Sequence, residues 1–229
     1  MIVSHKYGFI YLKTEKTGST SLERALSEII APDDFWPQGP RPAWGRVFPG
    51  LHGGATRQLP ELFGLHAHAT AAQVRRVFGR DIWDRYYKFS IERNPWDRQV
   101  SLYTHRQWKR GRGPEHFARD MASAVYRNTE FCRLNNWGIY AIGGKIAVDR
   151  VLRHEHLETD LASLCADLGL PKLTLGRHRA YGPARPHYSS YYDAAARDLV
   201  ARWYGREISA FDYDFEDRAG LCAITEAIS

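Results

Sequence analysis

The sequence has few cysteines and no long apolar run. Its 229 residues include three cysteines, Cys132, Cys165 and Cys222, an odd number at wide spacing. This spacing argues against a disulfide framework, and the lack of a Cys-x-x-Cys pair removes a common zinc-binding motif. No stretch approaches the roughly 18 consecutive apolar residues of a membrane-spanning helix. Residues 1–6 lack the cationic and apolar segments of a signal peptide. We expect a soluble, cytoplasmic protein.

Internal repeats and low-complexity tracts are also missing. The chain is 44% apolar, 25% charged and 13% aromatic, a composition that can build a sizeable core. The length predicts one domain over residues 1–229. Lys and Arg number 32 against 26 Asp and Glu, a net charge of +6. This surplus suits a polyanionic partner, although many proteins carry such a surplus and bind none. Where these charges lie along the chain therefore has to distinguish a polyanion-binding surface from an ordinary charge surplus.

Strand-like and helix-like patterns alternate along the chain. This order is typical of an α/β fold with a largely parallel central sheet. Between the first helix and the second, residues 31–60 hold six of the eleven prolines and predict an irregular insertion. Strands are expected at residues 7–12, 86–91, 139–141, 146–148 and 151–153, and helices from about residues 22, 70, 95, 157 and 196.

The loop after the first strand is rich in groups that bind anions. Gly18 permits close backbone approach, and amides at a helix N-terminus point toward a bound anion. Lys16 adds a positive charge. The loop therefore predicts phosphate binding, with an ordinary capping box of Thr20 and Glu23 as the alternative. Its sequence is Lys13-Thr-Glu-Lys16-Thr17-Gly18-Ser19-Thr20-Ser21.

This loop is not a Walker A motif. In that motif the lysine follows a glycine, whereas Lys16 precedes Gly18 by two residues. No paired carboxylates downstream offer a magnesium site. ATP chemistry is therefore less favoured, and a P-loop-like kinase of unusual sequence stays as an alternative.

A second anion-binding pattern follows a later strand. Arg93 ends that strand, and Asn94-Pro95 suit the start of a helix. Ser101 lies two turns further on, three residues after Arg98 and on the same helical face. A guanidinium with a hydroxyl suits a terminal phosphate monoester. The alternative is that Arg93 pairs with a carboxylate and Ser101 is an ordinary helix residue.

Together the two turns resemble those of the sulfotransferases that use 3′-phosphoadenosine 5′-phosphosulfate (PAPS), especially the carbohydrate-type branch near the 2-O-sulfotransferases. In that family the loop matching Lys16–Ser21 binds the 5′-phosphosulfate, and the segment matching Arg93–Ser101 binds the 3′-phosphate. The segments Val151–Leu157 and Phe211–Phe215 are also similar, so the resemblance spans roughly residues 7–216. Glu15 departs from it, because the family often has proline there.

The resemblance implies a P-loop-like, three-layer α/β fold. It also implies transfer of a sulfuryl group from PAPS to a hydroxyl, or an amine, of a saccharide, glycolipid or small metabolite. PAPS would be the cofactor and 3′,5′-adenosine bisphosphate the product, and no metal is expected. Lys16 matches the family's catalytic lysine. The residues implied to bind the cofactor are Lys16, Thr17, Gly18, Ser19, Thr20, Ser21, Arg93 and Ser101, with Arg185 in a later loop.

A His-x-His pair precedes the second helix. If this segment is extended, His66 and His68 leave the chain on the same face. Such a pair can also bind zinc, but no third and fourth ligands are evident. Another interpretation is one solvated and one hydrogen-bonded histidine. The resemblance to the 2-O-sulfotransferases implies His68 as the base and His66 as an orienting or substrate contact. His154 and His156 are expected to be structural or surface residues.

The acceptor is less readable from the sequence. The aromatic and basic residues of the insertion suit a carbohydrate, and equally the packing of a long loop. The basic run 106–112 either extends an anion site or forms a solvated helix end. Outside the enzymes, the alternative is a basic nucleic-acid-binding protein, although no such motif is present. The insertion residues concerned are Trp36, Arg41, Trp44, Arg46 and Arg57.

Overall fold

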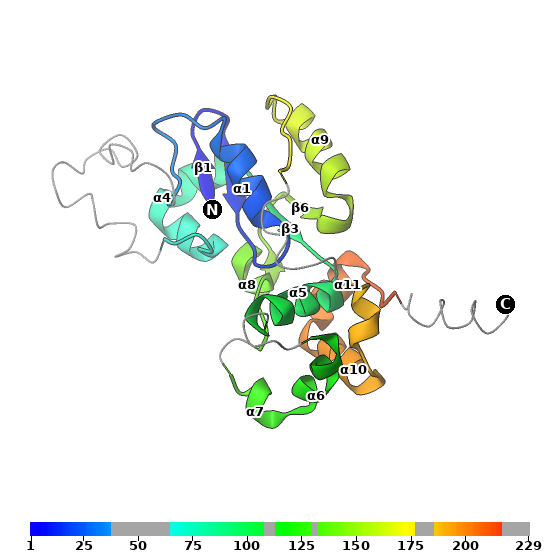
Figure 1. Cartoon of the computed structure of the whole chain (residues 1–229). Coiled ribbons are helices and arrows are strands. Elements are labelled where there is room, and N and C mark those ends of the chain that lie inside the picture. The colour runs from blue at the N-terminus through cyan, green and yellow to red at the C-terminus, as the bar shows by residue number, and fades with distance from the viewer. Residues whose placement is uncertain (38–64, 108–112, 130–131, 177–185, 217–229) are drawn as a thin grey trace. The chain divides into compact units, whose positions relative to one another are not determined.

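The computed structural model describes residues 1–37, 65–107, 113–129, 132–176 and 186–216 (Figure 1). Its contacts divide the chain into two compact units, each made of two segments. The first unit comprises Met1–Glu92 and Asn135–His178, and the second comprises Arg93–Leu134 and Arg179–Ser229. The prediction of a single domain over residues 1–229 stays a prediction.

The first unit is built on a four-stranded sheet of order β1-β2-β3-β6. Strand β1 runs antiparallel to β2, whereas β2, β3 and β6 are parallel to one another. The segments that follow β2 and β6 therefore begin at the same edge of the sheet. The predicted α/β fold with a largely parallel central sheet is confirmed. The strands are β1 (Ile2–Ser4), β2 (Phe9–Leu12), β3 (Tyr87–Glu92) and β6 (Arg150–Arg153).

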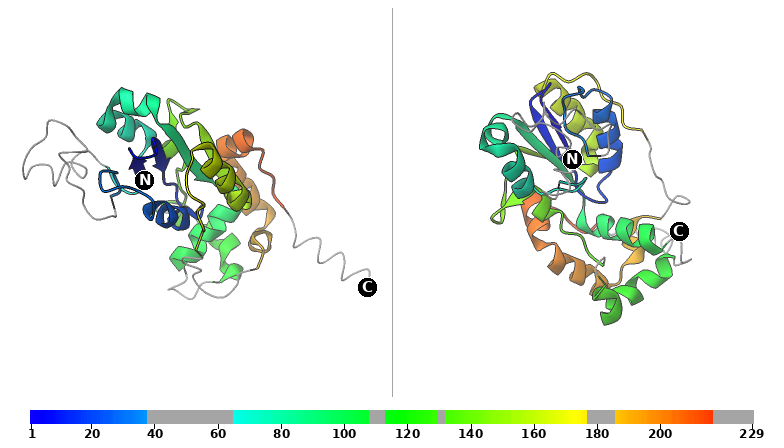
Figure 2. Two further views of the ribbon diagram at one scale, coloured as in Figure 1. Left: turned by 90° about the horizontal axis from the view of Figure 1, so that it is seen from above. Right: turned by 90° about the vertical axis from the view of Figure 1, so that its left-hand side faces the viewer.

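Helices cover both faces of this sheet, which gives the three expected layers (Figure 2). Helices α1 (Ser19–Ser27) and α9 (Leu157–Asp167) pack on one face. Helix α4 (Ala71–Arg85) lies on the other, where Lys88 Nζ donates to the Trp83 carbonyl at 3.1 Å. Alternate residues of each strand point to opposite faces, and all four residues of β2 are buried, so apolar side chains are covered on both faces. One apolar core lies on the side of α1 and α9. That core includes Phe9, Tyr11, Leu22, Leu26, Phe89, Ile91, Leu152, Leu157, Leu161 and Leu164.

Local signals set the ends of two helices as predicted. The Thr70 side chain accepts from the Gln73 N–H at 3.2 Å, and Gln73 Oε1 accepts from the Thr70 N–H at 2.8 Å. This reciprocal capping box starts α4 at the expected place. Helix α9 ends before Gly169, whose φ of +61° is the left-handed conformation that glycine tolerates.

Short elements were predicted less well. The run 139–141 was expected to be a strand, but Trp137–Tyr140 form helix α8. Only Ala141–Ile142 form a strand, β4, which pairs antiparallel with β5 (Lys145–Ile146). Such short apolar runs fit a helix and a strand equally well, so neighbouring contacts decide between them.

The expected last helix is two helices in the structure. Helix α10 (Ala194–Trp203) and helix α11 (Gly205–Phe211) are separated at Tyr204. Tyr204 is nearly buried, and its hydroxyl donates to Gln99 Oε1 at 2.9 Å. Gly205 follows directly, and glycine is a weak helix former, which favours a break at this point.

The second unit is helical. Helix α5 (Pro95–Gln107) begins as predicted, because Asn94 Oδ1 accepts from the Trp96 N–H at 3.1 Å. Rings dominate its core, with Trp96, Tyr103, Phe117 and Tyr204 among the buried residues. In the described part of this unit the other helices are α6 (Phe117–Ala122), α7 (Ala124–Arg127), α10 and α11, with 3₁₀ turns at Pro114–His116 (η3) and Tyr188–Tyr191 (η5). The 3₁₀ turn η4 (His154–His156) belongs to the first unit.

In the part of the chain that the structure describes, no helix has the length and apolar character needed to cross a membrane. Cys132 and Cys165 are free, buried thiols, and Cys222 lies outside the described residues. The insertion predicted at residues 31–60 is described only as far as residue 37.

Candidate functional site

The loop between β2 and α1 leads into an open helix N-terminus. Gly18 is the N-cap residue, with left-handed φ and ψ of 79° and 4°, and no side chain among the described residues caps the helix there. The alternative of a Thr20–Glu23 capping box is wrong, because α1 begins at Ser19 and Glu23 has other partners. The first amides of α1 therefore suit an anion.

Bonds from within the loop and from β3 give it a fixed path. The Thr14 hydroxyl donates to the Ile91 carbonyl at 2.5 Å and lies 2.9 Å from the Thr17 hydroxyl. The Ser19 hydroxyl donates to the Thr14 carbonyl at 2.5 Å. Lys16 lies between these residues with φ of 59°, a left-handed conformation that costs a non-glycine residue about 1–2 kcal/mol. Such strain persists only where surrounding contacts fix it.

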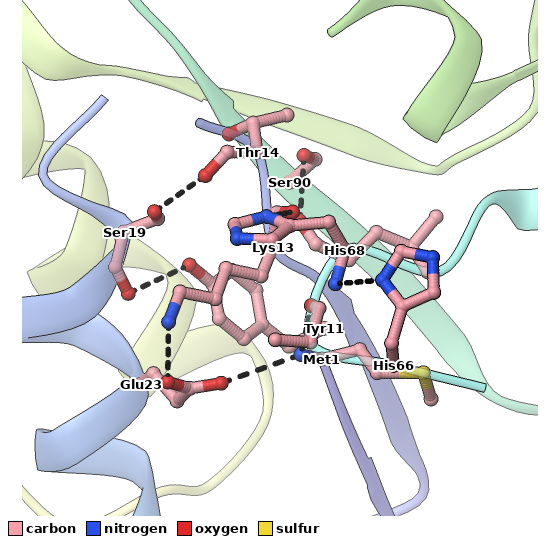
Figure 3. Close-up of polar contacts among 11 residues, drawn as sticks. Met1, Tyr11, Lys13, Thr14, Ser19, Glu23, His66, His68 and Ser90 are labelled. Carbon is pink, nitrogen blue, oxygen red and sulfur yellow. Dashed lines mark hydrogen bonds and ion pairs between the residues drawn. The ribbon is translucent and has the colours of Figure 1, made fainter. Parts of the chain in front are cut away.

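The two lysines of this loop have different surroundings. Lys13 is buried, and its Nζ donates to Glu23 Oε2 at 2.6 Å (Figure 3). The other Glu23 oxygen lies 3.3 Å from the Met1 α-amino group, so the charge of Glu23 is shared between two buried amines. Lys16 is half-buried. Because Lys13 is committed to Glu23, the predicted anion contact rests on Lys16.

The His66–His68 segment is a turn and not the extended segment considered above. The Ala69 N–H donates to the His66 carbonyl at 3.0 Å, and the His68 N–H donates to His66 Nδ1 at 3.1 Å. His66 is exposed and His68 is half-buried. The two imidazoles consequently have different partners, although they come from the same short segment (Figure 3).

The His68 side chain contacts the start of the loop that is predicted to bind an anion. Its Nδ1 lies 2.9 Å from the Lys13 carbonyl, which can only accept, so Nδ1 carries the proton and Nε2 keeps a lone pair. Burial lowers the pKa of His68 below its ordinary value, and the nearby Glu15 carboxylate opposes part of this shift. His68 is therefore a neutral imidazole at pH 7. His66 has the opposite tautomer, because its Nδ1 accepts a bond.

Two further residues contact this loop, and the sequence did not predict either contact. Asn136 is fully buried and bonds both backbone groups of Glu15, at 2.9 and 3.0 Å. His154, expected to be structural or surface, lies with Nδ1 3.0 Å from the Thr17 carbonyl. The signal for His154 was its place just after β6, whose end shares an edge with the end of β2. Asn136 carried no such signal.

The second predicted anion-binding turn, which begins at Arg93, belongs to the helical unit. The Arg93 guanidinium pairs with Asp97, with Nε donating at 2.8 Å, which is the carboxylate pairing considered as an alternative. Arg98 is fully buried between Glu207, at 3.2 Å, and the ring of Tyr204, at 4.4 Å. Arg98 therefore stabilises the core of this unit, contrary to the expectation of a phosphate contact.

Ser101 is half-buried on α5. Arg185, expected to contact the cofactor, lies outside the described residues, as do most of the insertion and the end of the basic run 106–112. In the described part of the chain, no group of three His, Cys, Asp or Glu side chains gathers to hold a metal ion.

Comparison with known proteins identifies the family of this chain. A model described as the sulfotransferase family matches residues 1–214, which is nearly the whole sequence. The chain belongs to the sulfotransferase family. Family membership supports sulfuryl transfer as the general chemistry. The narrower resemblance to the 2-O-sulfotransferases stays a prediction.

Two further proteins are similar to this sulfotransferase. An uncharacterized protein of Archaeoglobus fulgidus is 30% identical over 104 residues, which cover 44% of this chain and 83% of that protein. The crystal structure of a sulfotransferase from Alicyclobacillus acidocaldarius aligns with a TM-score of 0.45 and 17% identity, covering 91% of this chain and 96% of the other.

Gly18 and Gly8 offer a matched test of the loop. Both are half-buried with left-handed φ, but a Cβ on Gly18 would lie 3.0 Å from His154 Nδ1, whereas one on Gly8 would meet nothing within 4 Å. We expect Gly8→Ala to lower the free energy of unfolding by about 1–2 kcal/mol through backbone strain alone. Gly18→Ala should lower it further, as measured by urea denaturation. Equal losses would contradict the close packing of His154 on the loop.

Proposed function

We propose that this chain is a PAPS-dependent sulfotransferase acting on a hydroxyl, or an amine, of a saccharide, glycolipid or small metabolite. The observation that carries the proposal is the bond of 2.9 Å between His68 Nδ1 and the Lys13 carbonyl. This bond holds a neutral imidazole beside a loop that suits an anion. Sulfuryl transfer needs these two features together, namely a base for the acceptor and a positive site for the donor.

The loop is the proposed site of the 5′-phosphosulfate. Its residues fit that group, because the α1 N-terminus carries no side-chain cap among the described residues. A Cβ at Gly18 would lie 3.0 Å from His154 Nδ1, so only glycine allows the loop backbone to pass this close to the imidazole. Backbone amides of the loop, the Thr20 and Ser21 hydroxyls and the Lys16 ammonium would donate to the phosphate and sulfate oxygens. The Thr17 and Ser19 hydroxyls already donate within the loop, so these two residues would contribute their backbone amides. The proposed contacts are Lys16, Thr17, Gly18, Ser19, Thr20 and Ser21.

PAPS, when bound, supplies the sulfuryl group that is transferred. Such transfers proceed roughly in line, so the protein mainly positions the reactants and neutralises charge. The Lys16 ammonium would neutralise charge on the bridging oxygen of the leaving nucleotide. His68 Nε2 would accept the proton of the acceptor hydroxyl. His66, whose Nε2 carries a proton, would donate a hydrogen bond that orients the acceptor.

Arg93 and Ser101 are proposed to bind the 3′-phosphate, as the family resemblance implies. Arg93 would then share its guanidinium between Asp97 and the phosphate, since its five N–H donors can serve two anions. Arg185 is proposed as a further contact to the nucleotide. The cytoplasmic location expected from the sequence also stays a prediction.

Thermal unfolding with three nucleotides tests this proposal. At 100 times its dissociation constant, adenosine bisphosphate should stabilise the protein by about 2.7 kcal/mol. For a chain of this size that shifts Tm by about 5–10 °C. 5′-AMP at the same concentration should shift Tm far less, because it lacks the 3′-phosphate. In Arg93→Ala the difference between the two nucleotides should shrink or vanish.

Other outcomes would favour the alternatives. Stabilisation by ATP with magnesium, and none by the bisphosphate, would replace this proposal with a P-loop-like kinase. If no nucleotide shifts Tm while binding to DNA weakens steeply with salt, the chain is a basic nucleic-acid-binding protein.

A further inference from the structure

The side-chain amide of Asn136 bonds both backbone polar groups of one loop residue. Its Oδ1 accepts from the Glu15 N–H at 2.9 Å, and its Nδ2 donates to the Glu15 carbonyl at 3.0 Å. Asn136 is fully buried, so water does not compete for these bonds. Two bonds to one residue fix both the position and the orientation of that residue.

This arrangement does not serve the helix to which Asn136 belongs. Asn136 is the N-cap residue of α8, a position where asparagine ordinarily bonds an amide of its own helix. In the described residues it makes no such bond, and its side chain reaches a loop residue 121 positions earlier. The contact therefore concerns the loop and not the local stability of α8.

The loop is held on the other side of Lys16 as well. His154 Nδ1 bonds the Thr17 carbonyl at 3.0 Å, and the Thr17 hydroxyl bonds that of Thr14 at 2.9 Å. Lys16, with its left-handed φ of 59°, thus lies between two residues whose backbones are tied to other elements. A strained conformation of this kind persists because its neighbours are fixed.

We propose that Asn136 is a positioning residue, which holds Glu15 and thereby keeps Lys16 in the conformation that catalysis requires. This proposal rests on the proposed function of Lys16. Asn136 acts through the lysine and is assigned no contact with the reacting atoms. Its loss should therefore lower kcat, since a catalytic group displaced by about 1 Å can cost about 10²-fold in rate.

The test compares Asn136→Ala and Asn136→Asp with Asn135→Ala. Asn135 is an exposed neighbour whose Oδ1 accepts only a local bond, from the Gly138 N–H at 3.1 Å. The assay is release of adenosine bisphosphate from PAPS, with water or a phenol as acceptor. We expect Asn136→Ala to lower kcat by about 10²-fold. Asn136→Asp keeps the acceptor for the Glu15 N–H but sets a carboxylate oxygen against the Glu15 carbonyl, so it should also lower kcat, whereas Asn135→Ala should match the unchanged protein.

A double variant separates positioning from a general structural role. In a Lys16→Ala background, adding Asn136→Ala should slow the residual reaction no further, because both changes remove the same contribution. An independent additional loss would overturn the proposal, as would an unchanged kcat in Asn136→Ala. If Asn136→Ala fails to fold, the same comparison is made with Asn136→Asp.

Hydrogen exchange distinguishes failure of this proposal from failure of the proposed function. Without any nucleotide, the amides of residues 15–17 should exchange at least tenfold faster in Asn136→Ala or Asn136→Asp than in Asn135→Ala. Unchanged exchange would overturn the role of Asn136 whatever the enzyme does. Faster exchange in a protein that neither binds the bisphosphate nor turns over PAPS would support the role of Asn136 in fixing Glu15. It would overturn the proposal that this contact serves catalysis.

Discussion

Lys16→Ala is expected to lower kcat for PAPS turnover by at least about 10²–10³-fold, the usual effect of removing one charge-stabilising donor. The physical reason is that charge grows on the leaving oxygen during the reaction, so the ammonium contributes more to the transition state than to the bound ground state. The dissociation constant of adenosine bisphosphate should therefore change much less than kcat. Both quantities can be measured on the same preparation.

The control for Lys16→Ala is Lys145→Ala. Lys145 is an exposed lysine on β5, so its removal takes the same charge from the protein without touching the loop. We expect it to leave kcat unchanged. A Lys16→Ala enzyme of normal kcat would remove the catalytic assignment. A loss confined to bisphosphate affinity would make Lys16 a binding residue only.

His68→Asn is expected to lower kcat by about 10²–10⁴-fold, the range observed for general bases. Asparagine can still donate a hydrogen bond to the Lys13 carbonyl, which His68 Nδ1 contacts at 2.9 Å, but it has no basic atom. The structure around the loop should therefore persist while the proton acceptor is lost. His156→Asn, at an exposed histidine, serves as the matched control and should retain full activity. An active His68→Asn enzyme would move the base to another residue.

The pH dependence of both kcat/KM and stability should reflect the titration of His68. Burial lowers its pKa, so the neutral form persists below pH 6.5 and the acid limb of kcat/KM should lie below that value. The free energy of unfolding should also decrease toward acid pH. The folded state binds fewer protons than the unfolded state, so stability falls as pH drops from about 6.5 through the folded pKa.

His68→Asn should reduce this loss of stability at low pH. Burial also lowers the pKa of His5, so part of the loss will remain in the variant. The difference between the two urea denaturation series, measured from pH 7 to pH 5, isolates the contribution of His68. Identical pH dependence in the two proteins would contradict the burial of this imidazole.

The sequence predicted the elements whose signals are local. One example is the capping box of Thr70 and Gln73, and another is the helix start at Asn94-Pro95. Each depends on residues a few positions apart, so it can be predicted from the sequence. The strand–loop–helix around Lys16 and Gly18 is local in the same way. The short run at 139–141 was misjudged because three apolar residues fit a helix or a strand, and their packing in the fold decides.

The tertiary structure decided which side chains meet at the loop. Asn136 and His154 contact Glu15 and Thr17 from 121 and 137 residues away, through backbone atoms that every residue has. A bond of this kind cannot be predicted from a pattern of residue types. The commitment of Lys13 to Glu23, and the opposite tautomers of His66 and His68, likewise depend on partners that only folding brings near.

By itself, the sequence determined the α/β fold and pointed to the strand–loop–helix proposed to bind an anion and to the candidate histidines, because strand and helix periodicity and turn chemistry are properties of neighbouring residues. Only the tertiary structure decided that His68 keeps a lone pair on Nε2, that Arg98 belongs to a core, and that Lys16 lies between two residues tied by Asn136 and His154. Hydrogen bonds and burial between distant segments fix tautomers, ion pairs and strained backbone, and these depend on distances in space that the order of residues does not contain.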